Sequence, residues 1–371
     1  MNFNFYVPTQ IFSGIDAVKV NKEKFRLGET CFIVTGKHGA KASGALDDIL
    51  PILEEYNIKY SIFDEISENP PIATCYEGGK KCAEMGADFV IGIGGGSALD
   101  GAKAISAYAA NPGIEMDDLF DLSKTVNASL PIIAVPTTAG TGSEANPYSV
   151  MTLADGRRKR SFSSVYSWPK YSFVDPKYIA SLGYGYTISC ALDAFAHAIE
   201  SYLSPKSSVL SEAMSLFALK NIWGVFSSGN KEFNDCDLEA LMYSSLAAGI
   251  AISVTGTGFP HPLGYSLTLL DGVPHGKACA VFEWAFIEYN MKSEKGKERL
   301  DRIFAELGTD ASELSEKLYK LADVNVVLDD GKVKEYVDLV KDAKNYSNSP
   351  YVINEDEMYA IVKKALGGRL F

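Results

Sequence analysis

Two ionisable side chains lie one helical turn apart in an apolar stretch near the middle of the chain. The segment CALDAFAHAIESYL, residues 190–203, places Asp193 and His197 four residues apart. In a helix the two share one face, and neither suits a setting of Ala, Leu, Phe and Ile without a polar partner. The same spacing lets two helical side chains hold one metal ion. The alternative is a hydrogen-bonded histidine in the core.

Two more of the four histidines can complete such a site. His261 and His275 lie in GFPHPLGYSLTLLDGVPHGKACAVF next to proline or glycine, as expected at helix starts or in loops. One carboxylate and three imidazoles suit Fe²⁺ or Zn²⁺, whereas Mg²⁺ and Ca²⁺ prefer oxygen ligands. Spacing alone does not establish that the four side chains converge. The remaining histidine, His38, is expected at the surface or beside a cofactor.

A glycine-rich turn, GIGGGSALDGAK (92–103), follows an apolar strand and opens a helix. Three glycines leave backbone amides uncovered, and a serine adds a hydroxyl at the helix start. Such a helix N-terminus attracts phosphate through its dipole and its unpaired donors. The alternative is a tight turn that binds nothing. The candidate phosphate-binding residues are Gly94, Gly95, Gly96 and Ser97.

A second turn, PTTAGTGSE (136–144), also follows a strand and is rich in hydroxyl side chains. Turns at the carboxyl ends of two parallel strands line one crevice, which would suit two phosphates or a dinucleotide. A threonine-capped loop without a ligand is the alternative. The candidate residues of this turn are Thr137, Thr138 and Thr141.

The elements that must position these residues differ between the two halves of the chain. Strands alternate with helices at first, which predicts a parallel α/β sheet, and long segments of helical periodicity follow after about residue 180. We therefore predict an α/β domain at 1–180 and an all-helical domain at 181–371. Predicted strands are 31–36, 60–66, 88–94 and the start of 131–140, with helices at 45–56 and 72–86. Later predicted helices are 188–203, 208–228, 237–254, 277–292, 297–307, 310–322, 331–345 and 355–366.

The overall composition limits the class of protein. With 47% apolar and 22% charged residues, the 371-residue chain has the profile of a soluble globular protein of two domains. Its net charge of -12 argues against a nucleic-acid partner. The basic run at 157–160 is expected in a solvated turn between strands. We see no signal peptide, no apolar stretch of the roughly 18 residues that a membrane span needs, and no C-x-x-C pair, which together predict a cytoplasmic protein.

The motifs together resemble the iron-containing (group III) alcohol dehydrogenases, most closely their 1,3-propanediol and butanol dehydrogenase type. The similar segments are FYVPTQIFSG, VTGK, GIGGGSALDGAK, PTTAGTGSE, DAFAHAIESYLS, HPLGY and PHGKA, and they extend over nearly the whole chain. The resemblance implies a dehydroquinate synthase-like fold, with an α/β N-terminal dinucleotide-binding domain plus an all-α C-terminal domain. It also implies a homodimer, with the active site in the cleft between the domains. The family's four metal ligands fall on Asp193, His197, His261 and His275.

The reaction implied is the reversible oxidation of a primary alcohol or diol to an aldehyde by NAD(P)⁺. Fe²⁺ is the expected ion and Zn²⁺ the alternative, acting as a Lewis acid on the alcohol. By the same resemblance, the residues at 94–97 hold the pyrophosphate and the threonines of the second turn line the path of the nucleotide and nicotinamide ribose. Asp100 matches a family residue near the nicotinamide.

One position bears on the choice of cofactor. NAD-preferring relatives carry an Asp after the first strand, where this sequence has Gly36. Without that carboxylate a 2′-phosphate is not repelled, and Lys37 and Lys41 can pair with it. The sequence therefore favours NADP(H) over NAD(H). The alternative is that Gly36 only ends the strand.

The sequence departs from many members of the family at Tyr265. Those members carry a second histidine there, four residues after the third ligand, which is thought to relay the alcohol proton. Tyr265 or water is a substitute, and a packing role for Tyr265 is the alternative.

Other enzymes on the same fold are alternatives. A zinc-dependent glycerol dehydrogenase is the alternative most similar to the proposed alcohol dehydrogenase. A dehydroquinate synthase-like lyase would need many basic residues around a phosphorylated substrate, and the helical half offers few beside its ligands. A metal-free binding protein would be expected to lack at least one ligand, and all four are present.

Overall fold

The computed structural model describes residues 3–367, and the chain forms two compact units. The N-terminal unit comprises residues 7–183 together with 234–242. Among the described residues, the helical unit comprises 3–6, 184–233 and 243–367. These ranges differ from a single division at 180/181, because the short segment 234–242 groups with the N-terminal unit.

The N-terminal unit is built on a six-stranded parallel sheet with the order β1-β8-β5-β4-β2-β3. Alternating strands and helices were predicted, and the parallel sheet confirms that pattern. The strands are β1 (Gln10–Ser13), β2 (Thr30–Thr35), β3 (Lys59–Phe63), β4 (Phe89–Gly94), β5 (Ile132–Pro136) and β8 (Tyr171–Val174). The helices are α1 (Ala17–Val20), α2 (Gly39–Ala42), α3 (Ala45–Glu55), α4 (Ile72–Met85) and α5 (Gly96–Ala110).

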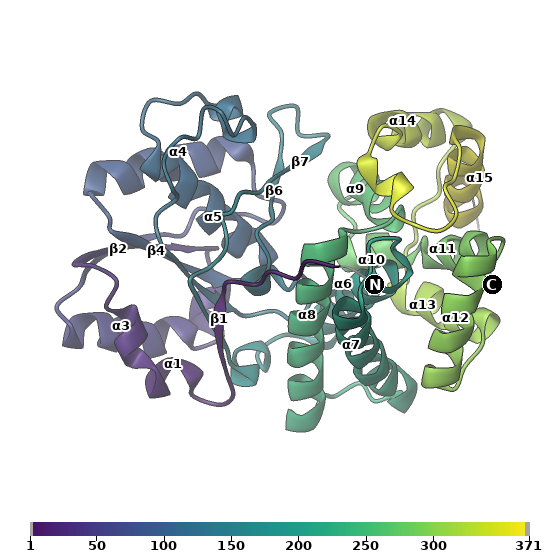
Figure 1. The fold of residues 1–371 in the computed structure, drawn as a ribbon, viewed down its shortest axis with the longest axis horizontal. Coiled ribbons are helices and arrows are strands. Elements are labelled where there is room, and N and C mark those ends of the chain that lie inside the picture. The colour runs from purple at the N-terminus through teal and green to yellow at the C-terminus, as the bar shows by residue number, and fades with distance from the viewer. Residues whose placement is uncertain (1–2, 368–371) are drawn as a thin grey trace. The chain divides into compact units, whose positions relative to one another are not determined.

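Alternate residues of the central strands fill two separate cores, one on each face of the sheet. Ile33 of β2 packs in the core shared with α1 and α3, whereas its neighbour Val34 packs in the core shared with α4 and α5. Figure 1 shows these two pairs of helices on opposite sides of β2 and β4. The central strands β2, β4 and β5 are buried on both faces, as helical crossovers require in a parallel sheet.

The strand order changes direction between β2 and β4. From β2 the chain goes outward to the edge strand β3, then returns to β4 on the other side of β2 and continues to β5. The carboxyl ends of these strands are in register, since Thr35 pairs with Ile93 and Gly94 pairs with Pro136. Ligands of open α/β sheets bind outside the strand ends at such a switch point. Both glycine-rich turns begin there.

A small antiparallel hairpin, β6 (Ser149–Thr152) and β7 (Lys159–Phe162), completes this unit. The basic run was predicted in a turn between strands, and Arg157 and Arg158 do lie in that turn. Lys159 and Arg160 instead begin β7, so the prediction is wrong for them. The Arg160 guanidinium lies over the Phe120 ring at 4.3 Å, which gives its cationic side chain a partner on the protein.

The described part of the chain from Tyr184 to the C-terminus contains only helices as regular elements, as predicted. A segment predicted as one helix at 277–292 is two helices, and the helix at 260–271 was not predicted. The α-helices of this part of the chain are α6 (Tyr184–Leu203), α7 (Val209–Ser228), α8 (Asp235–Thr255), α9 (Pro260–Asp271), α10 (His275–Ala280), α11 (Glu283–Asn290), α12 (Glu294–Leu307), α13 (Ala311–Ala322), α14 (Asp330–Val340) and α15 (Glu355–Leu366).

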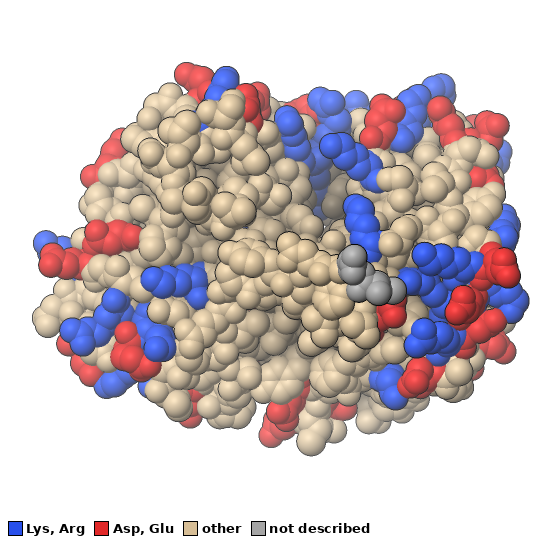
Figure 2. Space-filling view, in the orientation of Figure 1, with Lys and Arg blue, Asp and Glu red and all other residues tan. Residues whose placement is uncertain are grey.

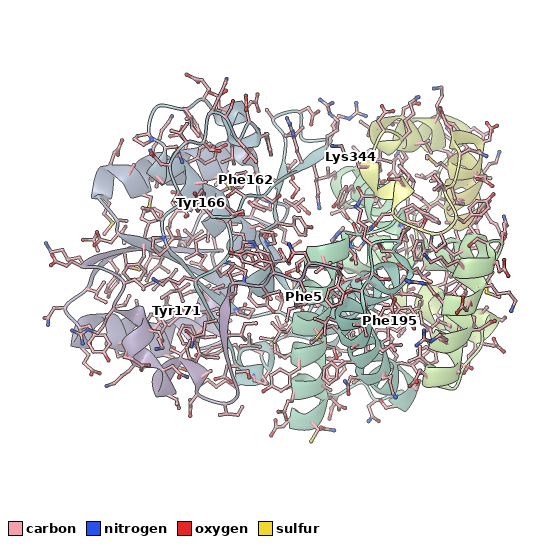
Figure 3. The ribbon with its side chains drawn as sticks, viewed as in Figure 1. Phe5, Phe162, Tyr166, Tyr171, Phe195 and Lys344 are labelled. Atoms are coloured by element: carbon pink, nitrogen blue, oxygen red, sulfur yellow. The ribbon has the colours of Figure 1, made fainter. Side chains whose placement is uncertain are left out.

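Polar residues cap the first turns of five of the helices from α6 to α15. Their side-chain oxygens accept hydrogen bonds from backbone amides that lack a partner inside the helix. Aromatic side chains join the helices further in: Phe195 of α6, labelled in Figure 3, lies 6.0 Å from the Phe226 ring of α7. The capping residues are Ser208, Ser293, Asp310, Asp329 and Asn354.

Two helices are long and apolar enough to cross a membrane by length and composition alone, α7 and α8. The prediction that no stretch reaches such a length is therefore wrong. Within their most apolar windows, 44% and 61% of the residues are buried inside the protein. Core helices of globular proteins have this composition, so the two helices are weak evidence for a membrane span.

Figure 2 shows charged side chains of both signs mainly around the margin of the face, with a broad area of other residues in its middle. Over α12 and α14 the neighbours of opposite sign form ion pairs, such as Lys297 with Asp301 and Lys334 with Asp338.

Candidate metal centre and cofactor turns

Four predicted site residues meet within the helical unit. Asp193 and His197 lie one turn apart on α6, His261 is on α9 and His275 begins α10. The Asp193 Oδ1 atom lies 3.8 Å from His197 Nε2, 3.7 Å from His261 Nε2 and 3.8 Å from His275 Nε2. Three imidazole nitrogens thus lie within 3.8 Å of one carboxylate oxygen.

Two glycines permit this convergence, and the sequence analysis did not identify them. A Cβ atom on Gly276 would lie 1.8 Å from the Ser189 carbonyl oxygen and 2.8 Å from the Asp193 nitrogen. A Cβ atom on Gly264 would lie 3.0 Å from the Ala278 backbone. Both glycines let one helix touch the backbone of another, α10 on α6 and α9 on α10. The sequence did contain a signal for these glycines, since Gly264 follows His261 by three residues and Gly276 follows His275 by one.

The site is buried and leaves polar atoms without hydrogen bonds. Asp193 and His261 are 4% and 2% exposed, and their Oδ1 and Nε2 atoms have no hydrogen-bond partner among the described residues. Separations of 3.7–3.8 Å are too long for hydrogen bonds. They are close to the distances of about 3.3–3.6 Å between ligands of a tetrahedral ion with metal–ligand bonds of about 2.0–2.2 Å. The residues therefore fit a divalent cation.

Charges in the site favour its ionised forms. Burial would raise the pKa of Asp193, but the imidazoles of His197, His261 and His275 hold it below its ordinary value. Burial would lower the pKa of His261, but Glu200 and Asp193 raise it to about 9. Protons and a metal ion therefore compete for the same imidazole nitrogen.

Glu200, on the same helix as Asp193, bonds the far side of the His261 ring. Its Oε1 and Oε2 atoms lie 2.7 and 2.9 Å from His261 Nδ1, and Oε2 also accepts a hydrogen bond from the Gly258 amide. A carboxylate at this nitrogen orients the ring so that Nε2 faces the candidate metal centre. Burial and the nearby Glu200 charge raise the pKa of Glu283 well above its ordinary value.

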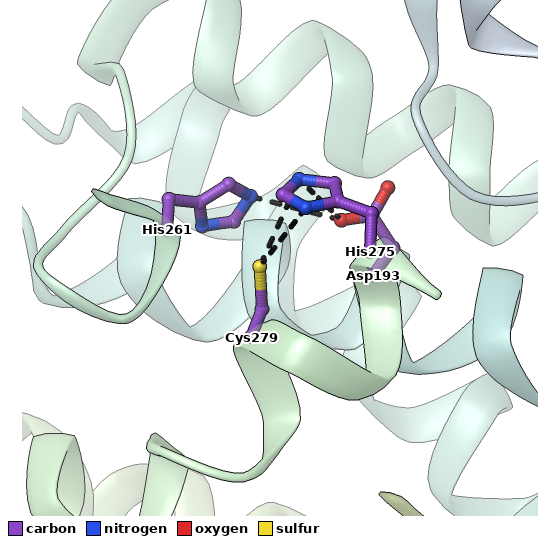
Figure 4. A group of neighbouring side chains, drawn as sticks. All are labelled: Asp193, His261, His275 and Cys279. Atoms are coloured by element: carbon purple, nitrogen blue, oxygen red, sulfur yellow. Dashed lines mark hydrogen bonds and ion pairs between the residues drawn. The ribbon is translucent and has the colours of Figure 1, made fainter. Parts of the chain in front are cut away.

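Two further side chains contact His275. The Tyr265 ring lies 5.5 Å from the His275 ring at an interplanar angle of 25°, so this tyrosine packs on a candidate ligand. Cys279 lies one turn after His275 on α10, and its Sγ atom is 3.8 Å from each ring nitrogen. Figure 4 shows this sulfur beside the His275 ring, next to Asp193 and His261. The cysteine was not singled out from the sequence.

In the N-terminal unit, the two glycine-rich turns are packed against each other. Gly94 has a φ of 149°, which favours glycine, and a Cβ there would lie 2.8 Å from the Ala98 Cβ. A Cβ on Gly96 would lie 2.4 Å from the Thr141 methyl carbon, and one on Gly95 would lie 3.0 Å from Thr138. No side chain caps the first turn of α5, which begins at Gly96. Its amides are therefore available to an anion.

Other residues of these turns are bonded to the protein. Ser97 accepts a hydrogen bond from the Asn69 amide at 3.2 Å, and Thr137 is 3% exposed. The Asp100 carboxylate accepts hydrogen bonds from the Ser143 hydroxyl at 2.5 Å and from the Val150 amide at 2.8 Å. Asp100 thus joins the second turn to the first, a role that the sequence analysis did not foresee.

A buried cation lies beside Asp100. Lys103 is fully buried, donates to Ser143 at 2.6 Å and to the Tyr148 carbonyl at 2.7 Å, and lies 3.7 Å from Asp100. Burial lowers its pKa to about 8 although Asp100 and Glu144 raise it. Burial also raises the pKa of Glu144 to about 7. Asp100 and Lys103 of α5 thus both hydrogen-bond Ser143 and hold the second turn against α5.

The residues considered for cofactor choice follow β2. Gly36 is partly exposed, and Lys37, His38 and Lys41 are exposed, with Lys41 on the short helix α2. A Cβ on Gly36 would lie 3.0 Å from the Ile66 carbonyl oxygen, a tight but not prohibitive contact. Because Thr35 pairs with Ile93, these residues start at the same sheet edge as the glycine turn after β4.

Comparison with known families gives two matches that together span most of the chain. A family profile described as iron-containing alcohol dehydrogenase matches residues 8–176. A second, described as the C-terminal region of the Fe-containing alcohol dehydrogenase family, matches residues 187–366. The first contains the candidate cofactor turns and the second contains the candidate metal centre.

Individual relatives agree with these profiles. A crystal structure of an iron-containing alcohol dehydrogenase from Thermotoga maritima is 33% identical, with a TM-score of 0.92, and the match covers 99% of this chain and 100% of that one. Alcohol dehydrogenase 4 of Saccharomyces cerevisiae is 29% identical over 97% of this chain and 98% of its own. NADH-dependent butanol dehydrogenase B of Clostridium acetobutylicum is 30% identical over 79% of this chain and 77% of its own.

Proposed function

Because this chain belongs to the iron-containing alcohol dehydrogenase family, we propose that it transfers a hydride between NADP(H) and a primary alcohol or diol, or the corresponding aldehyde. The observation that carries the proposal is the convergence of three imidazole nitrogens on Asp193 Oδ1, at 3.7–3.8 Å. Alcohol and butanol dehydrogenases among the relatives support a small alcohol or aldehyde as the substrate.

The protein's own residues have separate tasks in this proposal. Asp193, His197, His261 and His275 would hold Fe²⁺, with Zn²⁺ as the second choice. When bound, such an ion supplies Lewis-acid polarisation of the substrate oxygen. Glu200 holds the His261 ring in place through Nδ1. Tyr265, stacked on His275, is positioned as a packing residue, so we assign the alcohol proton to water.

The N-terminal unit would hold the dinucleotide at its switch point. The uncapped first turn of α5 suits the pyrophosphate, and Thr138 and Thr141 line the turn beside it. Asp100 would act by fixing the two turns together. We propose NADP(H) because Gly36 carries no carboxylate and the exposed Lys37 and Lys41 can pair with a 2′-phosphate. The relative named NADH-dependent shows that the family also includes enzymes that use the other cofactor.

The test is a cofactor and substrate assay on anaerobically purified, metal-reconstituted protein. We expect reduction of short aldehydes and oxidation of primary alcohols or diols, with kcat/KM for NADPH above that for NADH. Gly36→Asp should reverse the preference, and Lys297→Ala, which removes an exposed lysine of α12 in the helical unit, should leave it unchanged. A clear preference of the unaltered protein for NADH would overturn the cofactor assignment. Absence of any alcohol or aldehyde activity with every metal would overturn the function.

A homodimer in the cytoplasm is part of the same proposal. Phe3 and Tyr6, in the apolar N-terminal segment, are 47% and 57% exposed, which suits pairing with a second copy. Light scattering should give twice the monomer mass. A zinc-dependent glycerol dehydrogenase is the second candidate, favoured only by the ability of the same ligands to bind Zn²⁺. Activity confined to glycerol with zinc would support it.

A further inference from the structure

The thiol of Cys279 lies within the candidate metal centre. Cys279 follows His275 by four residues on α10, so the two side chains share a face of that helix. The side chain is fully buried, and its sulfur is 3.8 Å from both His275 ring nitrogens. Figure 4 shows it among Asp193, His261 and His275 rather than directed away from them.

The separations suit shared coordination of one ion. One ligand atom each from Asp193, His261, His275 and Cys279 lies within 4.8 Å of the other three. Zinc–sulfur bonds of about 2.3 Å and zinc–nitrogen bonds of about 2.0–2.1 Å place tetrahedral ligands about 3.3–3.6 Å apart. Small side-chain movements would bring the ligand atoms from separations of up to 4.8 Å to those that a bound ion requires. The buried Oδ1 of Asp193 and Nε2 of His261, which have no hydrogen-bond partner among the described residues, independently point to a cation here.

The setting of Cys279 differs from that of other buried cysteines in this chain. Cys75 and Cys82 lie on the buried face of α4 in an apolar core, and burial raises the pKa of both thiols to about 12. Those thiols pack as small hydrophobic groups. Cys279 contacts an imidazole instead, in a cluster that already has the Asp193 carboxylate and the imidazoles of His261 and His275.

We propose that Cys279 is an additional metal ligand, and that Zn²⁺ is held by Asp193, His261, His275 and the Cys279 sulfur. On binding, the thiol S–H bond breaks, its proton leaves to solvent, and the sulfur donates an electron pair to the ion, with no change of oxidation state. Four protein ligands make a closed site, whereas a catalytic ion needs an open position for its substrate. This inference rests on the proposed function, since it uses the same centre.

The consequence is discrimination between metals. Thiolates favour zinc over ferrous iron more strongly than imidazoles or carboxylates do. Fe²⁺ accepts more than four ligands, so the Asp193 and three-histidine set would leave it a position for the alcohol, whereas a tetrahedral Zn²⁺ with four protein ligands would have none. With Zn²⁺, Cys279 replaces His197 as the fourth ligand and fills the coordination shell. Cys279 is thus a residue that selects which ion supports activity.

The experiment uses Co²⁺ alone as a spectroscopic probe of the metal-free full-length protein under anaerobic conditions. We expect an intense sulfur-to-cobalt charge-transfer absorption in the near ultraviolet, beside the weaker visible bands of the ion. Cys279→Ala should lose the charge-transfer absorption and keep the visible bands. Cys236→Ala, which alters an exposed cysteine on α8, should keep both. Circular dichroism verifies that each variant folds.

Competition with a chelator gives a second measurement. Cys279→Ala should weaken Zn²⁺ binding by about tenfold or more and Fe²⁺ binding by much less, since only zinc gains from the sulfur. Charge-transfer absorption that is absent, or that persists in Cys279→Ala, would overturn the proposal. If Co²⁺ then still binds and His261→Ala abolishes binding, the metal centre of the proposed function stands. If Co²⁺ does not bind at all, both proposals are wrong.

Discussion

The two candidate sites treat their buried polar groups in opposite ways. In the N-terminal unit, Asp100 and Lys103 are hydrogen-bonded to the Ser143 hydroxyl and to backbone groups. In the helical unit, Asp193 Oδ1 and His261 Nε2 are buried with no hydrogen-bond partner among the described residues. Asp100 and Lys103 thus have their partners without a ligand, whereas Asp193 and His261 would gain theirs from a bound cation.

This difference between the two sites indicates a separate role for the buried charges of each. A satisfied network holds backbone turns in place, so its loss should appear as loss of stability. An unsatisfied cluster gains its missing partners from an ion, so its loss should appear as loss of metal binding. The substitutions below test this separation.

The largest effect is expected from Lys103→Met. The change leaves the buried Asp100 carboxylate without its cation, and breaking a buried ion pair in this way costs about 3–5 kcal/mol. Urea unfolding should report this loss, with metal affinity of the helical unit unchanged. Lys80→Met, which removes an exposed lysine of α4, is the control and should cost less than about 1 kcal/mol. Equal stability of the two variants would contradict the role of the network.

Glu144→Gln should change how stability depends on pH. Burial raises the pKa of Glu144 from its ordinary 4.5 to about 7 in the folded chain. The folded state therefore keeps a proton that the unfolded state releases, and stability from this group is lost as pH rises from 4.5 through 7. The free energy of unfolding of Glu144→Gln relative to the unaltered protein should rise by about 3 kcal/mol between pH 4.5 and 8. A difference independent of pH would show that Glu144 titrates normally.

Asp193→Asn should weaken binding of Fe²⁺ or Zn²⁺ by roughly 100-fold or more. Even the loss of a carboxylate that only hydrogen-bonds a metal-binding residue lowers metal affinity by about 10–100-fold. Secondary structure should be preserved, because the amide has the same shape. Chelator competition measures the affinity, and Asp301→Asn, on the exposed surface of α12, serves as the control. Unchanged affinity would mean that Asp193 is not a ligand.

Gly276→Ala should destabilise the chain by at least about 1–3 kcal/mol, the usual cost of adding a methyl group to a packed interior, because the new Cβ would lie 1.8 Å from the Ser189 carbonyl oxygen. The new Cβ would push α10 from α6 at Ser189, so metal affinity should fall together with stability. Gly224→Ala, in open space on α7, should instead stabilise by about 0.5–1 kcal/mol. Loss of stability with full metal affinity would separate the glycine from the site.

Much of the fold followed from local patterns. Apolar runs ended by glycine predicted β2 and β4, and periodic segments predicted α3, α4 and most of the later helices. Helix α9 was missed because Pro260, Pro262 and Gly264 fall in its first half, where they suggested a loop. Proline is tolerated in a first helical turn, which needs no donor there. The division between α10 and α11 carries no proline or glycine, so nothing local marked it.

The sequence by itself determined the residue types of both candidate sites and the spacing of Asp193 and His197, because four residues span one helical turn. Only the tertiary structure decided that His261 and His275 reach Asp193, and that Cys279 joins them, since these contacts depend on how α6, α9 and α10 pack. Likewise, the sheet order placed the turns after β2 and β4 side by side. Local spacing fixes which side chains share a face, but closeness across 60 to 80 residues requires two backbones to touch, as Gly264 and Gly276 allow.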